Sequence, residues 1–108
     1  MIRDFKNQDI DRVMDLWLAT NISAHSFIDS EYWKSNYDPV KAMMPSAIIY
    51  VYEENNVIQG FVGLMNDYIA GIFVSHLLQS KGIGKKLLDY AKDKKDVLSL
   101  SVYKEIKP

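Results

Sequence analysis

The chain has 108 residues, of which 48% are hydrophobic and 25% are charged, and its formal net charge is −1. These values are typical of a single globular domain, residues 1–108, and they argue against a disordered chain and against a general nucleic-acid binder. The chain has no cysteine, only two histidines, no signal-peptide pattern and no apolar run of the roughly 20 residues that span a membrane, so we expect a cytoplasmic protein without disulfides, a metal site or membrane contact.

The N-terminal part begins with a short strand and continues as an amphipathic helix. Residues 1–5 are the strand candidate, and residues 8–20 are the helix, with Asn7 as its expected N-cap. Apolar residues recur at helical spacing along one face of this helix: Ile10, Val13, Met14 and Trp17. This stripe is expected to pack on a sheet, with the indole of Trp17 in the core.

Residues 23–37 form a second segment, helical or irregular, that is rich in aromatic rings. Its ring-bearing side chains are His25, Phe27, Tyr32, Trp33 and Tyr37. A short third piece begins at Asp38-Pro39, because proline suits the first turn of a helix, and it ends at Pro45.

Three consecutive strands are predicted next. Residues 47–52 are β-branched and aromatic, residues 53–56 are a polar turn, and residues 57–65 return to the strand pattern, which together predict a β-hairpin. A second turn at residues 66–67 leads into a third strand at residues 68–74.

A glycine-containing segment follows, and it is the most informative part of the chain. Residues 79–88 read QSKGIGKKLL, which predicts a loop that opens a helix running to about residue 95. Backbone N–H groups and the positive end of the helix would converge there, which suits a phosphate group. Glycines at 82 and 84 let the main chain approach a ligand closely. Lys81, Lys85 and Lys86 either steer phosphates or form an ordinary solvated face.

The remaining residues complete the helix and add a strand. An apolar stripe marks the buried side of the helix: Ile83, Leu87, Leu88 and Ala91. Residues 97–103 then alternate in the manner of a last strand.

Spacing separates the readings of the glycine segment. A Walker A loop needs Ser or Thr after Gly-Lys, but Lys86 follows Gly84-Lys85 here. A dinucleotide fingerprint needs a third small residue where Leu87 stands. Two interpretations remain: a Q-x-x-G-x-G phosphate loop, and a helix with a glycine-rich first turn that binds nothing.

The Q-x-x-G-x-G spacing resembles the [RQ]-x-x-G-x-[GA] acyl-CoA loop of the GCN5-related N-acetyltransferase (GNAT) family. The order of elements, β-α-α-β-β-β-α-β, is similar to the first two-thirds of that family's fold. The hairpin at residues 48–65 and the strand–loop–helix at residues 68–88 each correspond in order. The resemblance implies a mixed α/β (α+β) fold with an acyl-CoA N-acyltransferase-like sheet.

The resemblance implies that acetyl-CoA is the co-substrate and that an acetyl group passes to a primary amine by direct attack. The backbone of Phe73 and Val74 would hold the thioester and the pantetheine arm. The pyrophosphate cradle would be formed by seven consecutive residues: Gln79, Ser80, Lys81, Gly82, Ile83, Gly84 and Lys85. Gln79 stands where the family more often has arginine.

The aromatic segment corresponds to the region where family members build the acceptor site. Phe27, Tyr32 and Trp33 are therefore candidates for lining an amine pocket, and packing against the sheet is their alternative role. His25 is a candidate general base, because imidazole titrates near neutral pH, and a structural role is its alternative. The general acid is unassigned, since no residue corresponds to the tyrosine that serves the family.

The family's last helix and two strands have no counterpart, so the resemblance implies a C-terminally truncated domain. An apolar strand at residues 97–103 would then have an open edge, which leads to the hypothesis of a homodimer formed through that strand. The functional alternative to an N-acetyltransferase is a catalytically incompetent CoA-binding or interaction module of the same fold.

Overall fold

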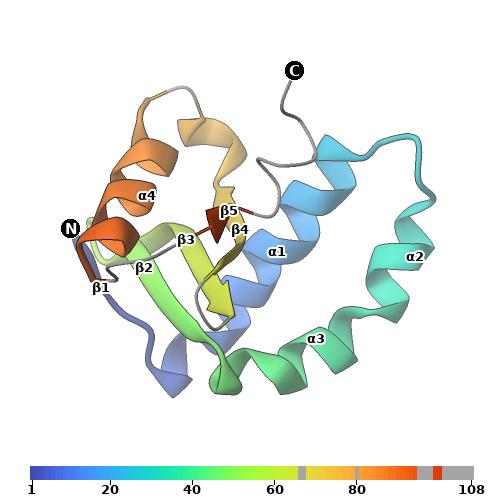
Figure 1. The fold of residues 1–108 in the computed structure, drawn as a ribbon. Helices are drawn as coiled ribbons and strands as arrows, with labels where there is room; N and C mark the ends of the chain where they lie inside the picture. The colour runs from blue at the N-terminus through green and yellow to red at the C-terminus, as the bar shows by residue number, and fades with distance from the viewer. Residues whose placement is uncertain (66–67, 80, 95–98, 101–108) are drawn as a thin grey trace.

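The computed structural model describes residues 1–65, 68–79, 81–94 and 99–100. They form one five-stranded sheet in the spatial order β1-β2-β3-β4-β5 (Figure 1). The strands are β1 (Ile2–Asp4), β2 (Ile48–Glu54), β3 (Val57–Met65), β4 (Tyr68–Val74) and β5 (Ser99–Leu100). Strands β1 to β4 pair with one another in antiparallel orientation, and β5 pairs with β4 in parallel orientation. The expected hairpin and the third strand after it are confirmed.

Helices cover both faces of this sheet (Figure 1). The helical elements are η1 (Asn7–Asp9), α1 (Ile10–Ala24), α2 (Ser30–Ser35), α3 (Tyr37–Met43), η2 (Met44–Ser46), η3 (His76–Leu78) and α4 (Ile83–Lys94). The aromatic segment predicted at residues 23–37 contains α2, and the short third piece predicted from Asp38 corresponds to α3, which begins one residue earlier. Asn36 ends α2 and precedes α3.

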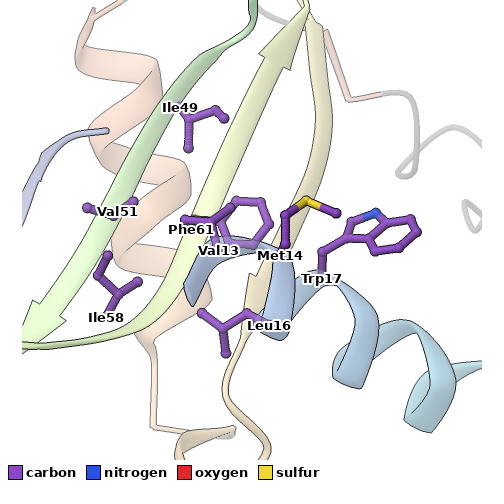
Figure 2. Packing of buried hydrophobic residues seen from close by; sticks show 8 residues of the cluster. All are labelled: Val13, Met14, Leu16, Trp17, Ile49, Val51, Ile58 and Phe61. Atoms are coloured by element: carbon purple, nitrogen blue, oxygen red, sulfur yellow. The ribbon is translucent and has the colours of Figure 1, made fainter. Parts of the chain in front are cut away.

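Side-chain alternation along the strands produces two separate cores. On one face, α1 packs on β2 and β3 through Val13, Met14, Leu16, Trp17, Ile49, Val51, Ile58 and Phe61 (Figure 2). On the other face, α4 packs through Tyr50, Val62, Leu64, Ile69, Ile83, Leu87 and Ala91. The predicted stripes of both helices are therefore confirmed, and Trp17 is buried.

The start of α1 differs from the prediction. Asn7 does not act as the cap; instead, the carboxylate of Asp9 accepts a hydrogen bond from the backbone N–H of Lys6 at 2.8 Å. The same carboxylate pairs with Arg3, at 2.8 Å from Nη1 to Oδ2, and Arg3 also reaches Glu53 at 3.2 Å. This network ties β1, η1 and β2 together. The Arg3 hydrogen bond lowers the pKa of Asp9 below its ordinary value.

The register of β3 and β4 shifts near the middle of the pair. Gly63 lies opposite Gly71, whereas the next pair is Leu64 opposite Ile69, so Ala70 has no partner on β3. A bulge of this kind changes which face the following side chains occupy. As a result, Ile69 and Ile72 both pack on the α4 side, three residues apart.

Several predictions concern residues outside the described ranges. Of the strand expected at residues 97–103, the structure describes only β5, so the homodimer through its edge stays a prediction. Among the helices that the structure describes, none has the length and apolar character needed to cross a bilayer. Within the same ranges, no three His, Asp or Glu side chains gather closely enough to hold a metal ion.

Candidate functional site

The outer edge of β4 presents backbone hydrogen-bonding groups. β5 pairs with β4 only at Tyr68 and Ile69, so no other described strand lies along this edge at residues 70–74. The N–H of Ser75 donates to Gln59 O on β3 at 2.7 Å. Because successive residues of a strand point their polar groups to opposite sides, those of Val74 point to the outer edge.

Because the backbone polar groups alternate in direction along β4, those of Phe73 point to the opposite side from those of Val74. The N–H and C=O of Phe73 point toward β3, opposite Phe61, and so belong to the interior of the sheet. The backbone contact expected of Phe73 is therefore not directed to the outer edge. Its ring instead stacks on Phe61, with 4.8 Å between centroids and an interplanar angle of 26°.

The glycine loop is attached to the end of this strand. Nε2 of Gln79 donates to the carbonyl oxygen of Val74 at 3.2 Å. Gly82 has φ of +81°, a left-handed conformation that only glycine adopts without strain. A Cβ on Gly84 would lie 3.8 Å from Ile72 Cγ2 and 3.9 Å from Val74 Cγ2, so the first turn of α4 sits directly beside β4.

The charges around the loop favour an anion. The side chains of Lys81, Lys85 and Lys86 are exposed at the start of α4. Lys85 forms an ion pair with Asp89 at 2.8 Å, which raises the pKa of Lys85 and lowers that of Asp89. This ion pair partly neutralises the charge of Lys85.

The remaining loop residues contribute through their backbone. Ile83, the first residue of α4, buries its side chain between this helix and the sheet, so only its main chain is available to a ligand. Ser80 lies outside the described residues. A left-handed glycine, a helix N-terminus and exposed lysines together fit a phosphate-bearing group.

A cavity of about 320 Å³ lies beside β4, on the face of the sheet that α1 covers. Its walls come from α1, α3, η2 and strands β2 to β4, and its residues include Trp17, Met44, Ile49, Gly63, Gly71 and Phe73. Among the described residues that line it, none carries a charge. An apolar hollow beside the β4 edge is a typical ligand site.

The predicted acceptor residues do not line this cavity. Phe27 is 83% exposed and Tyr32 is 55% exposed. Trp33 packs edge-on against Trp17, with 6.0 Å between centroids. His25 stacks on the Trp33 ring at 5.4 Å. These four residues form an aromatic group at the C-terminal end of α1, apart from the lining of the cavity.

The cavity was not predicted from the sequence. The sequence feature that indicates the cavity is the pair of glycines at positions 63 and 71, because glycine inside a strand often marks a close approach or a hollow. Which glycines oppose one another depends on strand register, so the signal alone did not locate the site.

Comparisons with known proteins agree with this geometry. Residues 45–106 match a family model described as an acetyltransferase (GNAT) domain. The whole chain is similar to the peptidyl-lysine N-acetyltransferase YiaC of Escherichia coli (strain K12), at 32% identity over 110 residues, and covers 75% of it. The peptidyl-lysine N-acetyltransferase YjaB of the same strain is 23% identical over 91 residues, which is 83% of this chain and 62% of YjaB.

Solved structures show the same fold. The solution structure of apo-form YjaB superposes with a TM-score of 0.80 at 22% identity, over 93% of this chain and 69% of that one. The crystal structure of PaiA N-acetyltransferase from Thermoplasma acidophilum, in complex with coenzyme A, gives a TM-score of 0.76 at 18% identity, over 93% and 77% of the two chains.

Proposed function

Because the chain belongs to the GNAT family of acyl-CoA-dependent N-acetyltransferases, we propose that it transfers the acetyl group of acetyl-CoA to the ε-amine of a lysine in a protein. The expected mixed α/β fold and acetyl-CoA as co-substrate are confirmed by the family match and by the neighbouring structures. Lysine as the acceptor is taken from the names of YiaC and YjaB, and it is part of the proposal.

One observation carries the proposal: Gln79 of the glycine loop is hydrogen-bonded to Val74, at the end of β4 where the backbone faces the outer edge. The Gln79–Val74 hydrogen bond fixes the loop to the strand end, and Gly84 places the first turn of α4 against Val74. A ligand with a diphosphate at one end and an amide-containing arm at the other would contact both parts at once. The main-chain groups near Gly82 would receive the diphosphate, and the edge of β4 would pair with the arm.

The residues of this chain contribute chiefly by binding and orientation. Acetyl-CoA supplies the acetyl group as a thioester, and transfer exchanges its C–S bond for a C–N bond to the amine while one amine proton passes to the departing thiol. Holding the reactants in attack geometry supplies up to about 7–11 kcal/mol of the barrier reduction. The outward N–H of Val74 is the proposed donor to an amide carbonyl oxygen of the pantetheine arm, so the thioester lies further along the β4 edge, toward Ala70.

The assignment of proton-transfer groups stays a prediction. His25 is the base candidate from the sequence, and its ring lies against the rings of Phe27 and Trp33 at the C-terminal end of α1, apart from the lining of the cavity. Phe27, Tyr32 and Trp33 likewise stay candidate acceptor contacts. They would meet the protein substrate around its lysine, outside the cavity.

Two measurements test the proposed function. Calorimetry with acetyl-CoA measures binding, and release of free CoA with a lysine peptide measures transfer. A matched peptide with arginine in place of lysine is the control. We expect saturable binding and transfer to the lysine peptide alone. Binding without transfer to any amine would support the CoA-binding module instead, and a failure to bind acetyl-CoA would overturn both.

The double variant Gly82→Trp with Gly84→Trp checks where binding occurs. Two indoles would fill the path along the loop, so acetyl-CoA binding should be lost while circular dichroism still reports a folded chain. Unchanged affinity would contradict the assignment of the loop.

A further inference from the structure

We propose that the cavity beside β4 binds the hydrocarbon part of an acyl group longer than acetyl, so that this chain also uses acyl-CoA thioesters such as butyryl-CoA. The inference rests on the proposed function, because it assigns the acyl donor of the same site. It begins from the size of the cavity. At about 320 Å³ the cavity far exceeds one methyl group, since a single water, of similar size, takes up about 30 Å³ in the liquid.

The shape of the cavity comes from three strand residues in one row. Ile49, Gly63 and Gly71 are consecutive partners across β2, β3 and β4, and all three line the cavity. A Cβ built on Gly63 would have no heavy atom within 4 Å. A Cβ on Gly71 would lie 2.7 Å from Cε2 of Phe73, so that ring lies over the glycine. The floor is therefore open above Gly63 and closed above Gly71.

The lining selects an apolar occupant. Three methionines, Met43, Met44 and Met65, contribute to the wall, and methionine adapts to ligands of varied shape. The described lining residues carry no charge, so an ammonium group entering the cavity would lose its hydration without gaining a carboxylate partner. A saturated hydrocarbon chain loses nothing by such a transfer and gains contact area.

The position of the cavity favours the acyl chain over other apolar groups. Starting from the glycine loop, the outer edge of β4 passes Val74 first, and Gly71, Ala70 and Tyr68 follow, all three lining the cavity. At about 3.3 Å per residue, Val74 and Ala70 are roughly 13 Å apart along the strand. An arm that starts with its phosphates at the loop and runs along this edge would carry its acyl end toward the cavity.

The transfer itself is the same with a longer chain. The amine nitrogen bonds to the acyl carbon, the C–S bond breaks, and one amine proton goes to the CoA thiol, so no further reactant is needed. The additional methylenes stay in the cavity throughout the exchange. Each buried methylene can improve kcat/KM by about fourfold.

The test measures kcat/KM with acetyl-, propionyl-, butyryl- and hexanoyl-CoA and with two lysine peptides of different sequence. We expect the parent chain to use butyryl-CoA at least as well as acetyl-CoA. Gly63→Val places two methyl groups in the open part of the cavity and should lower the butyryl-to-acetyl ratio by about tenfold. Gly63→Ala should lower it less. Ala42→Val, an exposed position on α3 outside the lining, is the matched control and should leave the ratio unchanged.

The outcomes separate this inference from the proposed function. Acetyl transfer together with butyryl-CoA used at less than a tenth of its rate would overturn the inference alone, as would a ratio unaffected by Gly63→Val in a variant that circular dichroism shows to be folded. A Gly63→Val effect that follows the peptide sequence and not the acyl chain would also overturn it. If no thioester supports transfer, the proposed function fails, and relative affinity for butyryl-CoA and acetyl-CoA by calorimetry still tests the cavity.

Discussion

Gly63 of β3 lies directly opposite Gly71 of β4, and both residues line the cavity on the α1 face of the sheet. Opposed residues in antiparallel strands normally stabilise the pair through side-chain contact, by about 0.2–1 kcal/mol. This pair has no such contact. The open space lies above Gly63, while the ring of Phe73 covers Gly71.

The two loop glycines are predicted to respond differently to alanine. Gly82→Ala forces a side chain into the left-handed region, at a cost of about 1–2 kcal/mol, and should also weaken acetyl-CoA binding by displacing the loop. Gly84→Ala should preserve both properties, because its Cβ would meet Ile72 and Val74 at ordinary contact distances. Urea denaturation and calorimetry measure the two effects. Equal losses in both variants would contradict the assigned role of the Gly82 conformation.

Gln79 is predicted to support acetyl-CoA binding through its hydrogen bond to Val74. Gln79→Ala removes the donor, and a lost bond of about 0.5–1.5 kcal/mol corresponds to roughly 3–10-fold weaker affinity. Gln79→Glu should be worse, because a carboxylate cannot donate and repels phosphates. Gln79→Arg keeps a donor and adds positive charge, so affinity should match or exceed that of the parent. An affinity order with Glu above Ala would rule out phosphate binding near this residue.

His25→Phe is predicted to retain acetyl transfer with an unchanged pH profile. Phenylalanine preserves the stacking on Trp33 and removes the titratable nitrogen atoms. Trp33→Ala is the companion variant and should lower the free energy of unfolding, because its ring packs against Trp17. Loss of the acidic limb of the kcat/KM profile in His25→Phe, with stability maintained, would instead establish His25 as the base.

The Arg3–Asp9 pair predicts acid-sensitive stability. Asp9→Asn should lower the free energy of unfolding by about 1.5–3 kcal/mol near neutral pH, the usual range for hydrogen bonds to charged groups. Because the pKa of Asp9 is lowered in the folded chain, its contribution is present above the unfolded value of about 4 and is lost as the pH falls through the folded value. The difference between parent and variant should therefore shrink below about pH 4.

Denaturant titrations across this pH range provide the measurement. Asp11→Asn is the control, since the Asp11–Lys41 pair at 3.0 Å is on the surface and Asp11 is 81% exposed. That variant should show little change at any pH. A constant difference for Asp9→Asn at all pH values would indicate that packing, and not the charge of Asp9, accounts for its effect.

Local patterns were sufficient for the elements that carry the loop. The bounds of β3 and β4 agree with the predicted residues 57–65 and 68–74, and α4 begins at Ile83, inside the segment predicted to open a helix. Each depends on a period of hydrophobicity or on a glycine close in sequence. The buried side chains of Ile83, Leu87 and Ala91 follow from the same period.

Predictions that needed contacts distant in sequence were less successful. Asp9 interacts with Arg3 and Lys6 at the start of α1, whereas the pattern favoured Asn7 as the cap. Phe73 was expected to offer its backbone, but the pairing with β3 turns that backbone inward. His25 and Trp33 stack through the fold of the α1–α2 connection, which no periodicity describes.

The sequence by itself determined the order of the elements, the glycine loop that opens α4, and the family that these imply, because each follows from residue types at short spacing. Only the tertiary structure decided that Gly63 and Gly71 face one another, that Val74 and not Phe73 points its backbone outward, and that an apolar cavity borders this edge. These features depend on strand register, and a register shifted by one residue would move every side chain to the opposite face.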